Sequence, residues 1–166
     1  MKKLTVLFLL LTVCVVNAQM GPPPALDNAL LKSLVGEWKG TSKSEMGDSQ
    51  ITETYELGLE GQFLLLNYQS TSANGAFNGM AAYTLNPESG QVSAYWIDSM
   101  RSMAEGSGKI EDKKMTLEWK GPWGTGTIAM ELVNENKIMG SSKFTMQDGS
   151  VMESTSEMMR VQMTEK

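Results

Sequence analysis

The side chains best suited to hold a small molecule are concentrated in segment 95–101, which reads YWIDSMR. Alternate side chains of a strand share a face, so we expect Trp96 and Asp98 on one face and Tyr95 on the other. Asp98 and Arg101 would then orient the polar head of a ligand, with Trp96 as an apolar wall. The alternative interpretation is an Asp-Ser turn in which Asp98 forms an exposed ion pair with Arg101.

The absent residue types exclude several kinds of chemistry. The chain contains no histidine, and its one cysteine, Cys14, lies in an apolar N-terminal segment. Downstream of that segment there can be no Ser-His-Asp or Cys-His nucleophile pair, and common zinc ligands are missing. An enzyme would depend on another base, with Asp98 or Glu105 beside Arg101 as the candidates. The 14 methionines form no compact Met-x-Met run, so we assign them to packing and expect no metal or cofactor.

Residues 1–18 have the features of a signal peptide. Two lysines are followed by a largely apolar stretch over 4–16, and small residues precede a cleavage point after Ala18. That stretch is shorter than the roughly 20 residues that a membrane-spanning helix needs. Val13 stands where a lipobox requires a small residue, which argues against lipidation at Cys14. We therefore expect an exported protein, periplasmic or extracellular, with a proline-rich tether over 19–25 and one domain over 26–166.

The mature chain is acidic. Removing 18 of the 166 residues leaves 148, enough for one domain, and also removes two of the 14 basic residues. The remaining 12 face 19 acidic residues, a net charge of −7, with no basic cluster. Nucleic acids and anionic membrane surfaces are therefore unsuitable partners. Without cysteine, the domain depends on burial and hydrogen bonds. No later segment is apolar enough to span a membrane, and the sequence indicates no oligomeric state.

From Leu34 to Val161, short apolar or alternating runs are separated by turn residues about ten times. This pattern predicts an all-β fold, an antiparallel up-and-down β-barrel of about ten strands. Before it, leucines at 26, 30, 31 and 34 predict a short helix covering one end of the barrel, with Asp27 at its positive end. Beyond a first strand near Trp38, the predicted strands are 51–59, 63–66, 76–85, 91–98, 101–110, 114–120, 124–133, 137–147 and 150–163.

One strand has a clear alternation. Over 51–59, the odd positions Ile51, Tyr55, Leu57 and Leu59 are apolar and the even positions are not, which predicts one dry and one wet face. Asn74-Gly75 is typical of a tight hairpin turn.

Aromatic residues on separate strands favour an internal pocket. A closed barrel can bring several of them around one cavity, and we take Tyr83, Trp96 and Trp119 as its walls. Asp98 and Arg101 are the predicted polar anchors. Ordinary core packing explains each aromatic residue taken singly, and for Trp38 we favour it, since a barrel needs a bulky end plug.

Segment 34–40, LVGEWKG, contains a Gly-x-Trp motif that resembles the opening of lipocalin-like and fatty-acid-binding-like barrels. Segments 59–64, 79–83 and 95–99 resemble a bacterial secreted group known as domain of unknown function 1579. The resemblance implies structural roles for Gly36, Trp38 and Gly61, with the tryptophan plugging one end. About ten strands is more than the usual eight of lipocalins and is similar to nitrobindin-type barrels. Those ligate haem through histidine, which this chain lacks, so the resemblance implies a shape without a cofactor.

We therefore predict an exported barrel that binds a small apolar or amphipathic molecule in an internal, largely apolar pocket. The second hypothesis is a structural or protein-interaction module of the cell envelope whose barrel is filled by side chains. An enzyme that uses a carboxylate is the third. A cavity would distinguish the first from the second, and a buried carboxylate facing an open pocket would mark the third.

Overall fold

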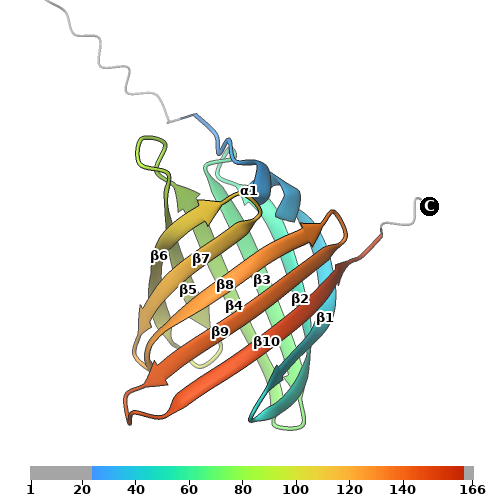
Figure 1. Ribbon diagram of the computed structural model, residues 1–166, viewed down its shortest axis with the longest axis vertical. Helices are drawn as coiled ribbons and strands as arrows, with labels where there is room; N and C mark the ends of the chain where they lie inside the picture. The colour runs from blue at the N-terminus through green and yellow to red at the C-terminus, as the bar shows by residue number, and fades with distance from the viewer. Residues whose placement is uncertain (1–23, 163–166) are drawn as a thin grey trace, which may run out of the picture.

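The computed structural model describes residues 24–162, which form a closed antiparallel barrel of ten strands with one short helix at one end (Figure 1). The predicted fold class is confirmed. The proposed signal peptide, 1–18, and residues 19–23 of the tether lie outside the described part. The elements are α1 (Ala29–Leu34), β1 (Gly36–Ser44), β2 (Gly47–Gly58), β3 (Phe63–Ser72), β4 (Gly75–Leu85), β5 (Gln91–Asp98), β6 (Met103–Glu111), β7 (Lys114–Gly121), β8 (Gly124–Asn134), β9 (Lys137–Met146) and β10 (Val151–Arg160).

Each strand pairs with its neighbours in the chain, and β1 pairs with β10 to close the barrel. The hairpin turns therefore alternate between the two ends. We call the end that carries α1 the helix end and the opposite one the far end (Figure 1). Over residues 24–162, no helix is long and apolar enough to cross a membrane.

Inward and outward positions alternate as predicted in β5. Val92 and Ala94 are buried, whereas Tyr95 is 58% exposed on the outer face. The expected dry face of β2 is only partly right. Ile51 and Tyr55 are buried, but Leu57 is 45% exposed near the end of the strand and Leu59 is 71% exposed beyond it. The reason is a turn: Leu59 and Glu60 both have positive φ angles, so the chain leaves the sheet there.

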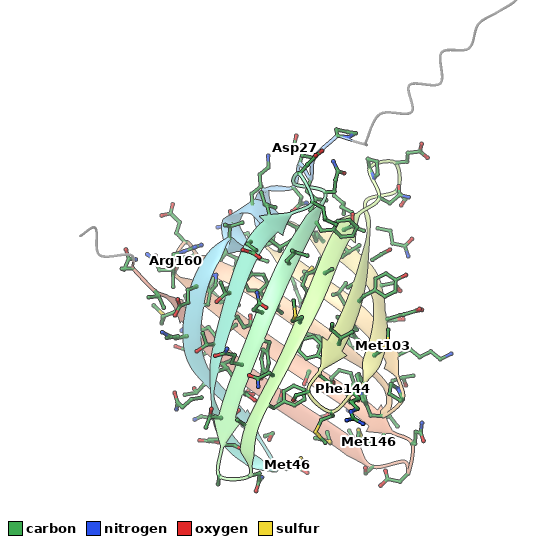
Figure 2. The ribbon with its side chains drawn as sticks, turned by 180° about the vertical axis from the view of Figure 1, so that it is seen from behind. Asp27, Met46, Met103, Phe144, Met146 and Arg160 are labelled. Carbon is green, nitrogen blue, oxygen red and sulfur yellow. The ribbon has the colours of Figure 1, made fainter. Side chains whose placement is uncertain are left out.

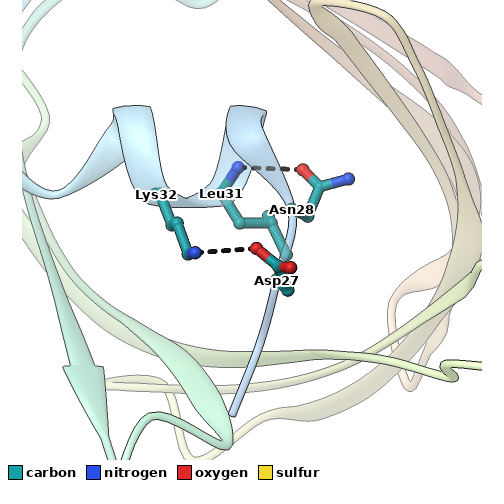
Figure 3. Close-up of polar contacts among 4 residues, drawn as sticks. All are labelled: Asp27, Asn28, Leu31 and Lys32. Carbon is teal, nitrogen blue, oxygen red and sulfur yellow. Dashed lines mark hydrogen bonds and ion pairs between the residues drawn. The ribbon is translucent and has the colours of Figure 1, made fainter. Parts of the chain in front are cut away.

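The helix that covers one end of the barrel begins one residue later than Asp27 suggested. Asn28 is its N-cap, and its side chain accepts a hydrogen bond of 3.1 Å from the Leu31 amide (Figure 3). Asp27 instead pairs with Lys32 at 2.8 Å on the exposed side. Leu31 and Leu34 on the opposite side are fully buried. The apolar stripe of α1 thus closes the helix end, as predicted.

Trp38 lies directly beneath this helix. Its indole is fully buried, and its Nε1 donates a 2.7 Å hydrogen bond to the Leu34 carbonyl. The guanidinium of Arg160, the register partner of Trp38 on β10, lies 4.1 Å from the centre of the indole ring. Arg160 also donates to the carbonyls of Val35 and Glu135, at 2.7 and 2.8 Å, and to that of Ser33. One side chain therefore connects helix, first strand and last strand.

Gly36 and Gly61 both occupy backbone conformations that favour glycine, with φ angles of +126° and +81°. A Cβ atom on Gly36 would lie 2.9 Å from Nη1 of Arg160. The carbonyl of Gly61 accepts a 2.8 Å hydrogen bond from the Leu26 amide. Both glycines lie where the segment around α1 is attached to the barrel.

Candidate ligand-binding cavity

Below the helix end, the barrel encloses a cavity of about 490 Å³. It extends to the far end, where Figure 2 shows Phe144 and Met146, away from Asp27 and Arg160. Most of its wall is aromatic, aliphatic or thioether, including Tyr55, Tyr68, Phe77, Tyr83, Trp96, Met115, Leu117, Trp119, Trp123, Ile128, Met130, Phe144, Met146, Met152 and Met158. The predicted wall residues Tyr83, Trp96 and Trp119 and the anchor Asp98 are thus brought together, whereas Arg101 does not line the cavity.

Three rings from β3, β4 and β5 form one aromatic cluster. The ring centres of Trp96 and Tyr68 are 5.8 Å apart in an edge contact, and those of Trp96 and Phe77 are 6.2 Å apart in a stacked one. The indole lies against Gly79, where a Cβ atom would be only 2.0 Å from Trp96 Cζ2. The glycine therefore sets the position of the tryptophan in the cavity wall.

Trp119 and Trp123 contribute a second aromatic surface. Trp123 contacts Phe144 edge-on, with ring centres 4.9 Å apart. Trp119 lies against Gly106, where a Cβ atom would be 2.9 Å from the indole. Its buried Nε1 has no hydrogen-bond partner within the described residues. The nitrogen itself is covered by protein atoms, so this unpaired donor is a local cost to stability.

Asp98 has two separate roles at the far end. Its Oδ2 accepts a 3.0 Å hydrogen bond from Trp96 Nε1, which holds the indole. Its Oδ1 accepts from the amides of Met100 and Ser102, at 2.9 and 3.1 Å, and so fixes the turn after β5. This turn is why β6 starts at Met103 rather than at 101.

The two other polar residues proposed for the site lie elsewhere. Arg101 lies in the turn with a φ angle of +61° and is exposed. It forms no ion pair with Asp98 among residues 24–162, so neither an Asp98–Arg101 ligand anchor nor an exposed Asp98–Arg101 pair exists here. Glu105 is exposed on the outer face, opposite Tyr95. The alternation of β6 directs Glu105 away from the barrel interior.

The carboxylate inside the cavity is Glu53 of β2, which sequence reasoning missed. It is paired in register with Trp38 on β1 and Tyr68 on β3. The Tyr55 hydroxyl donates a 2.6 Å hydrogen bond to its Oε2. The same hydroxyl lies 3.7 Å from the sulfur of Met130, across the barrel. Glu53 and Tyr55 therefore form the floor of the cavity, between its volume and the plugged helix end.

Burial alters the ionisation of this floor. It raises the pKa of Glu53 to about 7, against a smaller opposing effect of the hydrogen bond from Tyr55. Glu53 is only half-buried by exposed area, but that area faces the cavity rather than bulk water. Burial, with the nearby carboxylate, also raises the pKa values of Tyr55 and Tyr83, so both phenols are neutral at pH 7. Among residues 24–162, no lysine or arginine lines the cavity, and its acidic residues are Glu53, Asp98 and Glu153.

A sequence signal for Glu53 was available. It occupies the one charged position on the otherwise apolar face of 51–55, and a strand face turned into a core rarely carries an unpaired carboxylate.

Serine hydroxyls form the remaining wall, on the side of β1, β9 and β10. The Oγ atoms of Ser142 and Ser154 are 2.8 Å apart. Beside them, Gly140 is close enough to Ser156 that a Cβ atom would lie 2.3 Å from its Oγ. Ser42, Ser44, Ser142, Ser154 and Ser156 all line the cavity. The cavity thus has a broad apolar side and a narrower hydroxyl-rich side.

The chain belongs to the family described as protein of unknown function (DUF1579), whose model matches residues 24–164. This confirms the family suggested by segments 59–64, 79–83 and 95–99. No curated protein sequence matches the chain.

Solved structures share the fold at low sequence identity. The crystal structure of Rv2717c from M. tuberculosis is 13% identical, with a TM-score of 0.64 over 80% of this chain and 95% of that one. The S-type phycobiliprotein lyase CPES from Guillardia theta is 12% identical, with a TM-score of 0.56 over 82% and 92%. An odorant-binding protein from bovine nasal mucosa is 13% identical, with a TM-score of 0.41 over 87% and 80%.

Proposed function

We propose that this protein is a small-molecule-binding barrel that holds a largely apolar ligand inside its cavity. The observation that carries the proposal is the volume of about 490 Å³ enclosed by a barrel whose other end is plugged. Ligand cavities typically measure about 300–1,000 Å³ and combine apolar walls with a few polar groups. A module that functions only through its outer surface has no need of such a volume, because a filled core is more stable.

The composition of the wall supports an apolar or amphipathic ligand. Burying a ligand against aromatic and thioether side chains yields roughly 25 cal/mol for each Å² of apolar surface removed from water. Met115, Met130 and Met158 line the cavity with flexible side chains that adapt to an irregular ligand. The polar groups at fixed positions are Asp98 and the serine wall. They set the orientation of a ligand.

Export is part of the proposal. It rests on the signal-like sequence of residues 1–18. The ligand would then be a molecule of the periplasm or the extracellular medium, and its capture would not depend on reducing conditions.

Native mass spectrometry on the mature protein, expressed from the full-length sequence and purified from the exported fraction, tests this function. We expect a retained small molecule in stoichiometric amount, which solvent extraction releases and identifies. Trp96→Ala removes a cavity wall and is expected to abolish retention. Tyr95→Ala is the matched control, because the neighbouring ring points outward. An apo mass, together with no binding from a lipid and metabolite panel, would refute the proposal.

A further inference from the structure

Resting on the proposed function, we propose that the ligand is an organic cation: a protonated amine with an apolar body, whose ammonium group pairs with Glu53 at the cavity floor. Three features favour such a ligand: the negative charge of the cavity lining, the aromatic rings near Glu53, and the lack of a positively charged side chain beside Glu53 among the described residues.

The charge of the lining has one sign. Glu53 lies at the floor and Asp98 at the far end, and no lysine or arginine of the described part of the chain lines the space between them. An anionic ligand would be repelled at both ends. A neutral apolar ligand would displace water from the floor carboxyl without offering it a new partner, which is unfavourable. A ligand with a positive charge at one end is not repelled by the acidic residues, and it gives the carboxyl of Glu53 a new partner.

Glu53 also forms no ion pair among residues 24–162. Within residues 24–162, the one side chain that donates a hydrogen bond to it is Tyr55. The nearest guanidinium in the register belongs to Arg160, on the other side of Trp38. That group is already committed to the Trp38 ring and to three main-chain carbonyls. The carboxylate therefore has capacity for a donor that a ligand supplies.

Aromatic rings surround the position of the ammonium group. Tyr55, Tyr68 and Tyr83 line the cavity near Glu53, and Trp96 contacts Tyr68 towards the far end. Cations bind to the faces of such rings, and this attraction is largest where water is excluded. A carboxylate within an aromatic enclosure is the combination that makes burial of an ammonium group favourable.

Binding is coupled to a proton. At neutral pH, Glu53 is partly protonated because burial raises its pKa to about 7. The groups that face it from β2, β3 and β4 are the neutral phenols of Tyr55, Tyr68 and Tyr83, while β7, β8 and β10 present Met115, Met130 and Met158. No other facing group titrates in this range. When an ammonium group arrives, the carboxyl releases its proton to solvent and the ion pair remains.

The test compares three probes that share an apolar body: phenylbutylamine, phenylbutanol and phenylbutanoate. Isothermal titration calorimetry on the full-length chain at pH 8 is expected to give the amine at least about tenfold higher affinity than the alcohol. The preference is expected to disappear in Glu53→Gln, which keeps the shape and an acceptor for Tyr55. Glu56→Gln, exposed on the same strand, is expected to retain it. In the wild-type protein at pH 6.5, titrations in two buffers of different ionisation enthalpy are expected to reveal proton release on amine binding.

The outcomes separate this inference from the proposed function. Equal affinity for amine and alcohol, or amine binding without proton release, would refute the cationic ligand. Neither result would refute the proposed small-molecule-binding function. Higher affinity for the carboxylate probe overturns it too. If none of the three binds, the cation is rejected, and the native mass spectrum decides separately whether the barrel is a container. The proton measurement uses the unmodified chain, so the test stands even if Glu53→Gln fails to fold.

Discussion

The hydroxyl of Tyr55 donates a 2.6 Å hydrogen bond to Glu53 inside a barrel whose cavity is lined by no lysine or arginine from residues 24–162. This places an ionisable carboxyl where its charged form is poorly solvated. Burial of the charged carboxylate is unfavourable for folding at neutral pH, and such costs are common at binding sites.

The cost predicts a pH-dependent stability. The folded pKa of Glu53, about 7, exceeds its ordinary value of 4.5, so the folded state retains a proton that the unfolded state releases. No penalty exists below about pH 4.5; it grows as the pH rises and is complete above about pH 7. At 1.36 kcal/mol per pKa unit, its upper limit is about 3 kcal/mol. Glu53→Gln is therefore expected to stabilise the protein at pH 8 and to have little effect at pH 5, measured by urea unfolding.

Glu56→Gln is the control for that experiment, since Glu56 is exposed. It removes the same charge from the same strand and is expected to change stability by less than about 0.5 kcal/mol at either pH. Equal stabilisation by the two variants would show that net charge, and not the buried position, is responsible.

Tyr55→Phe is expected to raise the pKa of Glu53 still further. The phenol stabilises the carboxylate form, so its loss leaves only the effect of burial. Carbon-detected NMR titration of the Glu53 carboxyl measures this directly. Tyr95→Phe removes a hydroxyl from the outer face and is expected to leave the titration unchanged. A downward shift in Tyr55→Phe would contradict the assigned hydrogen bond.

The fold could be predicted because a barrel repeats one local rule. Alternation at period two and turn residues such as Asn74-Gly75 are local features, and together they specify ten antiparallel strands. Antiparallel neighbours then follow from short connections alone. The helix plug was also predictable, since leucines at four-residue spacing have a single apolar face.

The site was harder to predict because it depends on contacts between distant strands. Arg101 seemed to belong to the pocket, but the hydrogen bonds from Met100 and Ser102 to Asp98 form a turn that leaves it outside. Glu53 was missed because its strand read as apolar on that face. Its aromatic surroundings include Tyr68, which is 15 residues away in the sequence and directly opposite in the strand register. The serine wall likewise forms only where the last strands meet the first.

Gly79→Ala is expected to disturb the cavity wall without changing the charge of any lining residue. The added methyl carbon would lie 2.0 Å from Trp96, so the indole must move, and it is displaced within the cavity wall. Overpacking of this kind typically costs about 1–3 kcal/mol. Near-ultraviolet circular dichroism and ligand retention are expected to change together. Met80→Ala, on the outer face of the same strand, is the control and is expected to change neither.

The two arginines of the chain allow a matched test of the plugged end. Arg160→Lys removes the planar fork that lies on Trp38 and bonds the carbonyls next to α1, so it is expected to cost about 1–3 kcal/mol despite unchanged charge. Hydrogen exchange of the amides in α1 is expected to accelerate, because the helix loses its attachment to β10. Arg101→Lys makes the same chemical change in an exposed turn, and its expected effect is within about 0.5 kcal/mol. If the two variants behave alike, the guanidinium of Arg160 does not hold the helix end, and the burial of Leu31 and Leu34 alone keeps the plug in place.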